Sequence, residues 1–589
     1  MREFMSGNEA TARGAWEAGV EVAAAYPGTP STEILEKLAG LPGVYAEWST
    51  NEKVALEAAF GASLTGRRAI TAMKHVGLNV ASDSLMTLGL VGAKAGLVIA
   101  VSDDIGFASS QNEQDSRFWG RFVHLPVLEP ADAAEAYAMT RDAFSISERH
   151  QVPVLLRLTT RVSHVKRTLT TGERAAPAAS AHGYARDVER WIITPNHVGK
   201  RLEVRAQRDA ALAEESAASP WNVLELGADR TVGFVASGAA YHVVREAFPQ
   251  ASVLKLGFSH PLPLTLARKL AAAVERVMVV EESEPIVEAE LNAVGIAAVG
   301  RTWLPAHGEV TAPALEAAVA RLLGEQGAGL ELPKPNKVFP RPPTLCAGCP
   351  YMGVYFWLGQ LKDAVICGDI GCYTLGCGEP WNAMDSIISM GASLGVAHGM
   401  AKSFAGNGTA KPVLAVIGDS TFIHGGMPAL ANIAYNGANV TVLLLDNRVA
   451  AMTGGQDTPR LDFAQLVTAL GVRPERVRTV DPYELPAFFK VLREEIKAPE
   501  PSVIIAERPC VLSRDFVRRR PLKVIDDKCN GCARCLDVGC PAITVTRRES
   551  EARASGKVVE RAWVRIESGL CTGCDVCAKA CAHGAMVAA

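Results

Sequence analysis

The sequence lacks the features that mark a membrane, secreted or nucleic-acid-binding protein. No apolar run in its 589 residues approaches the roughly 18 residues that a membrane helix needs. The first ten residues, MREFMSGNEA, include acidic side chains and no apolar core segment, so we expect no secretory signal and a cytoplasmic protein. The formal net charge is only −3, which gives no reason to expect nucleic acid or an anionic membrane as a partner.

The chain also has no low-complexity tract, and its composition is that of a large globular protein. Hydrophobic residues make up 48% and charged residues 21% of the sequence, which is ordinary for a protein with real cores. A length of 589 residues allows roughly three to five domains of about 150 residues. We therefore expect a multidomain protein.

Short apolar runs alternate with helical patterns, and this rhythm predicts parallel α/β domains. Residues 1–165 contain the runs VEVAAAYPG, RRAITAM, GLVIAV and PVLLRL. Residues 226–330 contain RTVGFVAS, SVLKLG and RVMVVEE, and residues 341–512 contain DAVICGDIG, VLAVIGD, VTVLLLDN and PSVIIAERP. We interpret the polar stretch 166–225 as a partly helical connector. The proline-rich segment LELPKPNKVFPRPP marks a boundary before the third domain.

A basic segment, SRDFVRRRPLK, separates the third domain from a cysteine-rich tail at residues 524–589. We interpret this segment as a solvated linker. The alternative, which the sequence leaves open, is a docking surface for an acidic electron carrier.

The tail holds eight of the 14 cysteines, in two similar runs. Disulfides are not expected in a reducing compartment, so C-x2-C spacing points to metal or redox centres. Three thiolates at C-x2-C-x2-C spacing can wrap one corner of an iron–sulfur cube, and in two-cluster ferredoxins the fourth cysteine of each run binds the other cluster. Zinc knuckles, the alternative, do not need a duplicated four-cysteine run. The runs therefore predict one [4Fe-4S] cluster on Cys529, Cys532, Cys535 and Cys581, and a second on Cys571, Cys574, Cys577 and Cys540.

This tail resembles bacterial-type ferredoxins that carry two [4Fe-4S] clusters, and the resemblance implies a small α+β domain. Two details depart from the usual pattern. One extra residue precedes Cys540, and Ala582 stands where proline normally follows the last cysteine. Neither departure removes a ligand.

The tripeptide Gly418-Asp419-Ser420 ends an apolar run, at the sheet edge where open α/β folds bind ligands. Taken alone, it indicates a turn in which Asp419 caps the next helix. Asp446-Asn447 follows after 25 residues, and the two pieces together resemble the thiamine diphosphate motif. The resemblance implies that Gly418, Asp419, Ser420 and Asn447 bind the cofactor. Mg²⁺ prefers oxygen ligands shared with phosphates, and the implied protein ligands are Asp419, Asn447 and a backbone carbonyl near Val449.

Enzymes that use thiamine diphosphate also need a glutamate, which bonds the cofactor aminopyrimidine, from another domain. In that family the glutamate opens a helix, and a glycine follows nine residues later. NEKVALEAAFGAS places Glu52 and Gly61 at this spacing, which implies that Glu52 is catalytic. Without the companion motif, Glu52 would be an ordinary solvated carboxylate at a helix start. Glu57 is the competing candidate.

Several longer stretches resemble one family from end to end. GNEATARGAWEAGVEVAAAYPGTPSTEI, AMKHVGLNVASDSLM, SSQNEQDSRFWGRF, GDIGCYTLG and MGASLGVAHG are similar to the large (alpha) subunits of indolepyruvate ferredoxin oxidoreductases, within the 2-oxoacid:ferredoxin oxidoreductase family. The resemblance implies conversion of an aryl pyruvate, CoA and oxidised ferredoxin to an aryl-acetyl-CoA, CO₂ and reduced ferredoxin. It also implies a thiamine pyrimidine-binding-type domain at 1–165, a transketolase-C-terminal-like domain at 226–330 and a thiamine diphosphate/Mg-binding domain at 341–512.

The family motifs contain further candidate residues. His75 in MKHVGLN and His424 in STFIHGG are predicted either to assist proton transfer or to orient the substrate carboxylate. The alternative for each is a structural histidine near a glycine turn. Thr29 and Ser31 in YPGTPS are candidates for contact with the substrate or cofactor, and turn formation is the equally open alternative.

Four further cysteines suggest a third cluster. CAGCP resembles the start of the motif that holds a cluster beside thiamine in pyruvate:ferredoxin oxidoreductase, although Tyr351 stands where relatives often have histidine. The alternative is a set of buried thiols acting as small hydrophobes. The matching positions are Cys346, Cys349, Cys372 and Cys510.

No stretch remains for the smaller domain that relatives use in inter-subunit and CoA-linked steps. The resemblance therefore implies a separate beta subunit and a hetero-oligomer, with ferredoxin as electron acceptor. Three alternatives stay open: the same chemistry on pyruvate or a branched 2-oxoacid, a non-redox thiamine decarboxylase with a regulatory cluster tail, and an electron-transfer subunit that binds no thiamine.

Overall fold

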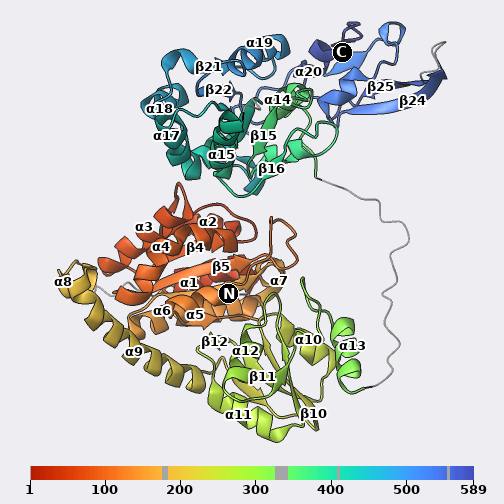
Figure 1. Ribbon diagram of the computed structural model, residues 1–589. Helices are drawn as coiled ribbons and strands as arrows, with labels where there is room; N and C mark the ends of the chain where they lie inside the picture. Colours follow the sequence, from red (N-terminus) through yellow and green to blue (C-terminus); the bar gives the residue numbers. More distant parts are fainter. Residues whose placement is uncertain (1, 176–182, 325–342, 408–410, 553–557) are drawn as a thin grey trace. The chain divides into compact units, whose positions relative to one another are not determined.

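The computed structural model describes residues 2–175, 183–324, 343–407, 411–552 and 558–589, and Figure 1 shows their course. The chain forms two compact units, Met1–Asn336 and Lys337–Ala589. All but the last residue of the predicted proline-rich boundary lies outside the described residues. None of the described helices combines the length and the apolar character that crossing a bilayer requires.

The first unit contains a seven-stranded sheet in the order β12-β6-β7-β5-β4-β2-β3. All neighbours in it are parallel except the edge pair β12 and β6. The strands are β2 (Val22–Ala25), β3 (Tyr45–Trp48), β4 (Ala69–Lys74), β5 (Leu97–Asp103), β6 (Val127–Leu128), β7 (Val154–Thr159) and β12 (Phe258–His260). The three central strands β4, β5 and β7 are buried along their whole length, as expected for parallel strands covered on both faces.

Helices surround this sheet in packed pairs. Helix α1 (Gly7–Glu17) packs on α6 (Ala133–His150), and α3 (Glu52–Leu64) packs on α4 (His75–Val91). The predicted strands VEVAAAYPG, RRAITAM, GLVIAV and PVLLRL correspond to β2, β4, β5 and β7. Thr29, Glu52 and His75 follow the carboxyl ends of β2, β3 and β4, which are neighbours in this sheet.

A second sheet in the same unit has five strands in the order β14-β13-β10-β11-β9. Only the β9 edge, Val223–Glu225, is antiparallel. The three runs predicted for residues 226–330 form β10 (Asp229–Ser237), β11 (Ala251–Leu256) and β13 (Arg276–Val280). The edge strand β14 is Ala298–Val299. The same chain region also donates β12 to the first sheet, so the two domains share a strand that the sequence pattern did not indicate.

The connector at 166–225 is partly helical, as predicted, but it begins with a strand. Strand β8 (Lys166–Thr170) pairs antiparallel with β1 (Arg2–Ser6). The short helix α8 (Val188–Trp191) and the long helix α9 (Pro195–Ala218) follow. Helix α9 buries only Arg208, Leu212 and Ser216, so it is mostly a solvated helix.

The second unit is built on a parallel six-stranded sheet in the order β16-β15-β17-β18-β22-β21. The four predicted runs correspond to β15 (Val365–Gly368), β17 (Val413–Gly418), β18 (Thr441–Asp446) and β22 (Ser502–Glu507). The outer strands are β16 (Ser386–Ile387) and β21 (Val477–Val480). Strands β17 and β18 lie side by side with Gly418 opposite Leu445, so their carboxyl ends meet at one edge.

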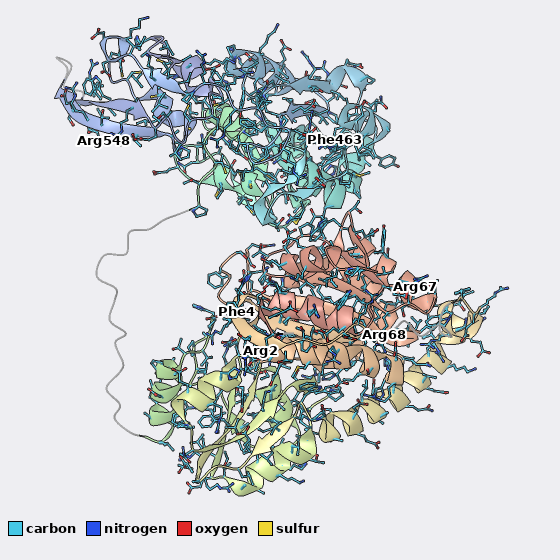
Figure 2. The ribbon with its side chains drawn as sticks, turned by 180° about the vertical axis from the view of Figure 1, so that it is seen from behind. Arg2, Phe4, Arg67, Arg68, Phe463 and Arg548 are labelled. Carbon is cyan, nitrogen blue, oxygen red and sulfur yellow. The ribbon has the colours of Figure 1, made fainter. Side chains whose placement is uncertain are left out.

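The cysteine-rich tail forms a small α+β element of the second unit. It contains the pair β23 (Leu522–Val524) and β26 (Met586–Ala588), the hairpin β24 (Ile543–Ala552) and β25 (Val558–Ile566), and helix α20 (Val576–Ala580). Arg548, labelled in Figure 2, lies on this hairpin. Apolar side chains of the tail, including Val538 and Val564, share one core with Tyr355 and Leu443 of the six-stranded domain. The tail is therefore packed into the unit and not held only by a linker.

The basic segment before the tail follows the surface of a cysteine loop. Arg518, Arg519 and Arg520 are exposed, while the Arg519 amide donates to the Thr572 carbonyl at 3.0 Å. A Cβ atom on Gly573 would lie 2.3 Å from the Arg520 carbonyl oxygen. The backbone of this segment is thus fixed against the Cys571–Cys574 loop, although its side chains remain solvated.

Candidate functional site

Asp419 lies at the carboxyl end of β17, where the strand turns directly into a helical segment. The residue is buried, and its carboxylate accepts hydrogen bonds from the Ser420 amide at 2.7 Å and the Arg448 amide at 2.8 Å. Gly418 must lack a side chain, because a Cβ there would lie 2.5 Å from the Tyr373 ring. The strand end thus presents an oxygen ligand in a fixed position.

A second carboxylate lies beside Asp419 and was not among the predicted ligands. Burial and the neighbouring Asp446 carboxylate together raise the pKa of Asp419 to about 7. Both aspartates line a cavity of about 260 Å³; Phe463, labelled in Figure 2, also lines it. A buried carboxylate beside a half-buried one is unfavourable without a cation, so this oxygen donor set fits a hard divalent ion.

The other predicted ligands surround the same strand ends. Asn447 is buried, and its amide oxygen accepts a hydrogen bond from the Val449 amide at 3.1 Å. Arg448 between them adopts a left-handed φ of 67°, which turns the chain sharply after β18. The structure therefore brings Asp419, Asn447 and Val449 to one edge, with Asp446 closer to Asp419 than the sequence indicated. The signal for Asp446 was its place as the last residue of the apolar run.

Glu52 begins helix α3, as the sequence predicted, and Asn51 caps that helix by accepting from the Val54 amide at 2.9 Å. The Glu52 side chain is buried against the first turn of α4: a Cβ on Gly77 would lie 2.5 Å from Glu52 Oε1. Gly61, the second half of the predicted motif, has no atom within 4 Å of such a Cβ. The glycine that positions Glu52 in this unit is therefore Gly77.

Glu57, the competing candidate, lies on the outer face of α3. Its side chain is 48% exposed and 3.9 Å from the Lys53 ammonium. It accepts a hydrogen bond from the Ser84 hydroxyl at 2.5 Å. These are the surroundings of a surface carboxylate, and Glu52 remains the better candidate.

His75 is the first residue of α4 and is only 1% exposed. Its Nδ1 accepts a hydrogen bond from the Asp104 amide at 3.3 Å. Burial is the largest cause that lowers the pKa of His75, so the ring is neutral at pH 7. His424 is also buried, in a π-helical turn just after Asp419, and belongs to the second unit.

The YPGTPS turn follows β2 at the same sheet edge as His75. The Ser31 hydroxyl donates to the Gly28 carbonyl at 2.8 Å, which is a bond internal to the turn. The Thr29 carbonyl accepts from the Ser109 hydroxyl at 3.4 Å. The turn is thereby joined to the loop after β5. Ser31 serves the turn itself, while Thr29 lies next to the loop that also contacts His75.

The first predicted cluster set surrounds one small enclosed cavity in the tail. Cysteines of the first run and the last cysteine of the second run line it together, with Lys528 and Arg534 at the rim and no carboxylate. Burial and the neighbouring thiols raise the pKa of Cys535 to about 12. The lining cysteines are Cys529, Cys532, Cys535 and Cys581.

The second set gathers around Cys577. Burial raises the pKa of the Cys577 thiol, and the next contributions come from Cys574, Cys540 and Cys571. Among the described residues, no three His, Cys, Asp or Glu side chains converge on a single ion.

The four cysteines proposed for a third cluster also lie together. The thiol of Cys349 is buried, and its pKa is raised first by that burial and then by Cys372, Cys510 and Cys346. The two remaining cysteines differ. Cys367 lies 3.7 Å from the Met400 sulfur, and Cys377 is exposed. Cys367 thus lies in different surroundings from the four matched cysteines, whereas Cys377 lies near Tyr355 together with Cys349 and Cys372.

The three cysteine groups follow one another through the second unit. The Tyr483 hydroxyl bonds the Gly348 carbonyl, and both Cys574 and Cys349 act on Tyr483 electrostatically. Cys577 of the middle group is influenced by Cys535 of the outer group. Cys532 of the outer group and Cys346 of the Cys349 loop are both exposed, so the series joins that loop to the tail and reaches solvent at both ends.

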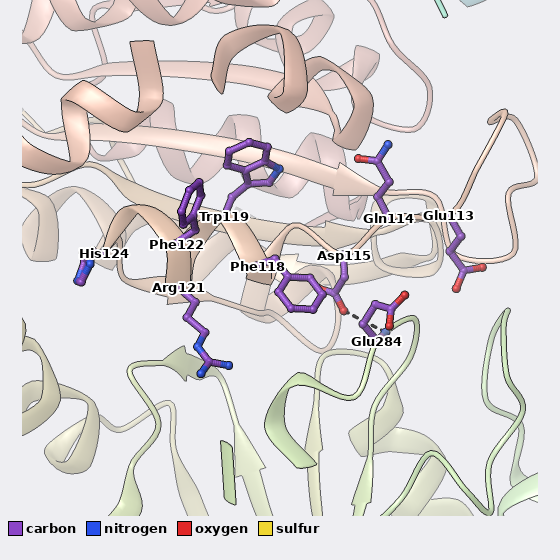
Figure 3. A pocket seen from close by; sticks show the side chains of 9 residues that line it. All are labelled: Glu113, Gln114, Asp115, Phe118, Trp119, Arg121, Phe122, His124 and Glu284. Atoms are coloured by element: carbon purple, nitrogen blue, oxygen red, sulfur yellow. Dashed lines mark hydrogen bonds between the residues drawn. The ribbon is translucent and has the colours of Figure 1, made fainter. Parts of the chain in front are cut away.

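A separate open cavity of about 790 Å³ lies on helix α5 (Arg117–Val123) in the first unit, and Figure 3 shows its lining. Phe118 and Phe122 are 48% and 63% exposed. The Glu284 amide donates to Asp115 at 3.3 Å across the cavity floor. None of the predicted site residues lines this cavity.

Comparison with known proteins identifies the class. Residues 13–174 match the family described as pyruvate flavodoxin/ferredoxin oxidoreductase, thiamine diP-bdg, and residues 369–506 match the C-terminal TPP binding domain of thiamine pyrophosphate enzymes. The first match includes Glu52 and His75, and the second includes Asp419 and Asn447. These domains define a thiamine diphosphate-dependent 2-oxoacid oxidoreductase.

Two relatives narrow the assignment. The chain is 38% identical to indolepyruvate oxidoreductase subunit IorA of Methanothermobacter thermautotrophicus, over 99% of this chain and 97% of the relative. It is 38% identical to the IorA subunit of Pyrococcus abyssi, over 98% and 96%. The chain therefore belongs to the indolepyruvate oxidoreductase subunit IorA family, which confirms the resemblance drawn from the motifs.

A solved 2-oxoglutarate:ferredoxin oxidoreductase from Magnetococcus marinus, with 2-oxoglutarate, coenzyme A and succinyl-CoA bound, aligns with a TM-score of 0.43. It shares 19% identity over 51% of this chain and 61% of its own.

Proposed function

We propose that this chain, with a smaller beta subunit, oxidatively decarboxylates aryl pyruvates of the indolepyruvate type. The products are an aryl-acetyl-CoA and CO₂, and the two electrons pass singly through iron–sulfur clusters to ferredoxin. The observation that carries this proposal is the match to IorA subunits over 97% of their length, which includes the cysteine-rich tail. The relatives are named as one subunit of an oxidoreductase, which supports a separate beta subunit.

The residues at the two strand edges have distinct roles in this proposal. Asp419, Asn447 and the Val449 carbonyl would hold Mg²⁺ and through it the cofactor diphosphate, with Asp446 supplying further negative charge. Gly418 leaves room for the Tyr373 ring, and Ser420 would meet the diphosphate. When bound, thiamine diphosphate accepts the electron pair that CO₂ leaves behind.

In the first unit, Glu52 would hydrogen-bond the cofactor aminopyrimidine and move its proton. The packing of Glu52 against Gly77 supports this role, because a proton-transfer group must be held in a fixed place. Thr29 would contact the substrate or cofactor from the neighbouring turn. His75 and His424, both buried, would donate or accept hydrogen bonds near the reacting carbon.

The cysteine groups would form an electron path. We propose [4Fe-4S] clusters on the Cys529 and Cys571 groups and a third on Cys346, Cys349, Cys372 and Cys510. The order of the groups, from the Cys349 loop through Cys574 to Cys535, supports a continuous path, and the exposed Cys532 would give ferredoxin access to its outer end. Protein-bound cluster potentials span roughly −700 to +450 mV, a range that includes ferredoxin.

The test is the content of iron, acid-labile sulfide and thiamine in the two-subunit protein purified without oxygen. We expect about twelve irons per chain and one thiamine, since each of three cubes holds four irons. About eight irons per chain together with thiamine would show that the third cluster does not form and that Cys346 and its three partners are ordinary thiols. Iron without thiamine would contradict the enzyme assignment and favour an electron-transfer subunit.

Substrate choice is tested separately by reduction of a one-electron dye. We expect reduction to require CoA and to be fastest with indolepyruvate or phenylpyruvate. Faster reduction with pyruvate or a branched 2-oxoacid would mean that the enzyme performs the same reaction but prefers that other substrate. CO₂ release without dye reduction would indicate the non-redox decarboxylase.

A further inference from the structure

Lys74 is a buried cation at the same sheet edge as Glu52. It is the last residue of β4 and the N-cap of the 17-residue helix α4, and it is 8% exposed. Its ammonium donates to the Ser109 carbonyl at 2.8 Å. The nearest carboxylate oxygen, Asp104 Oδ2, is 4.0 Å away. Lysine is almost never buried without a partner, so this arrangement needs an explanation.

Asp104 is only a distant ion-pair partner of Lys74 at 4.0 Å, because its oxygens are held by shorter hydrogen bonds. Oδ2 accepts from the Ser109 amide at 2.8 Å and the Ser110 hydroxyl at 2.5 Å, and Oδ1 accepts from the Thr160 hydroxyl at 2.9 Å. Within the described residues, the Lys74 ammonium uses one of its three N–H groups. Burial outweighs the distant Asp104 and lowers the pKa of Lys74 to about 8. The Lys74 ammonium, paired only loosely with Asp104, therefore has N–H donors that the described residues leave unused.

His75 adds a second donor from the next residue. Because its Nδ1 accepts the Asp104 amide hydrogen, the proton of the neutral ring is on Nε2. Nε2 is buried with no hydrogen-bond partner in the described part of the chain, although the Asn112 side chain approaches the ring and raises its pKa. Lys74 and His75 thus contact the same loop after β5, and both retain unused N–H groups.

The surroundings connect this pair to the cofactor side of the sheet. Gly28 of the YPGTPS turn packs on Lys74, since a Cβ on Gly28 would lie 3.0 Å from Lys74 Cβ. Three residues along α4, Gly77 packs on Glu52. The N-terminus of α4, which has no side-chain cap, adds the partial positive charge of its free amides.

We propose that Lys74 and His75 bind the carboxylate of the 2-oxoacid substrate. The Lys74 ammonium supplies the charge, and the His75 Nε2–H supplies a neutral hydrogen bond. One cation with one neutral donor suits a singly charged carboxylate, whereas the doubly charged diphosphate has its own site at Asp419. This inference rests on the proposed function, and it names the group that recognises the acid end of the substrate.

The first experiment compares K74M with wild type as the thiamine-loaded two-subunit enzyme. Truncating one partner of a buried charge pair weakens binding by roughly 30-fold or more, so we expect KM for indolepyruvate to rise at least that much. Thiamine and iron contents stay unchanged. K74R keeps the charge and restores most of the affinity. The control is K166M, because Lys166 lies on β8 with half of its side chain exposed.

Binding of unreactive analogues separates this inference from the proposed function. Indole-3-lactate keeps the carboxylate, and indole-3-lactamide lacks its charge. We expect calorimetry to show tighter binding of the acid than of the amide in wild type, and equal weak binding of both in K74M. If K74M had the same KM and bound the acid as tightly as the wild type does, the inference would be overturned and the proposed function would stay intact. A wild-type enzyme that binds the acid but reduces no dye would instead contradict the proposed function.

If K74M fails to retain thiamine, the same comparison of acid and amide binding is made with H75Q. Weaker binding of the acid with unchanged binding of the amide would support the site. Equal changes for both ligands, or none, would overturn it.

Discussion

At the scale of single residues, Gly77 has no side chain because Glu52 occupies the space. A Cβ there would meet Glu52 Oε1 at 2.5 Å and Glu52 Cγ at 2.6 Å. The backbone of α4 therefore acts as the surface on which the glutamate rests. The carboxylate proposed for proton transfer is thus positioned by a residue that has no side chain of its own, and the pattern of charged residues in the sequence does not reveal this contact.

Replacing this glycine tests the arrangement. We expect G77A to push the Glu52 carboxylate out of place and to lower kcat by at least about 10-fold, with about 1–3 kcal/mol of lost stability from overpacking. G61A is the matched control, because nothing lies within 4 Å of a Cβ at Gly61. Dye-reduction kinetics and thermal unfolding of both variants provide the check. Equal activity of G77A and G61A would contradict the role of this contact.

At the scale of elements, the short strand β12 joins the second domain to the first sheet, and it ends with His260, which is half-buried. Burial is the main cause that lowers the pKa of His260 to about 4, and His124 and Arg121 add repulsion. Asp209 faces His124 at 2.7 Å and partly offsets that charge. The junction is therefore built around a neutral imidazole.

This histidine makes the junction sensitive to acid. In the unfolded chain His260 binds a proton near its ordinary pKa of about 6.5, while the folded protein resists protonation until about pH 4. The stability that a neutral His260 contributes is therefore present above pH 6.5 and is lost between pH 6.5 and 4. We expect the first unit to lose about 1–2 kcal/mol between pH 7 and pH 5, and H260Q to lose less. The measurement is the denaturant midpoint of wild type and of H260Q at pH 7 and at pH 5. An identical loss of stability in H260Q would exclude His260 as the cause.

The elements themselves were largely predictable, and their contacts were not. The apolar runs at β5, β7, β17, β18 and β22 are long and branched enough to identify buried parallel strands. Glu52, Asp419 and Asn447 followed from spacing within short motifs. Lys74, Gly77 and Asp446 did not, because their significance comes from neighbours on other strands. The β12 exchange also escaped prediction, since a three-residue strand leaves no periodic pattern.

At the scale of the whole molecule, the two compact units differ in how their parts depend on one another. In the second unit the tail shares its core with the six-stranded domain, whereas the sequence indicated a separate domain at 524–589. Leu522, Val564 and Met586 of the tail are all part of that core. The tail therefore contributes to the folding of the unit as well as to its electron path.

Truncation checks this dependence. We expect a chain ending at residue 520 to lose the cooperative unfolding of its second unit, because removal of the tail exposes apolar side chains that are now buried. The fragment 1–324 keeps its own core and should unfold cooperatively alone. Thermal unfolding followed by circular dichroism distinguishes the two. A cooperative transition in the second unit of the chain ending at 520 would mean that the shared core is dispensable.

Strand β12 also determines when the first sheet can be completed during synthesis. The two-residue strand β6 pairs with Phe258 and His260 of β12. These two residues are synthesised long after β7 at Val154–Thr159. Until then the nascent domain presents an open strand edge, the kind of edge that pairs with other chains. During translation there is thus an interval in which the seven-stranded sheet lacks its last strand. The interval ends when β12, which belongs to the second domain, has been synthesised and pairs with β6.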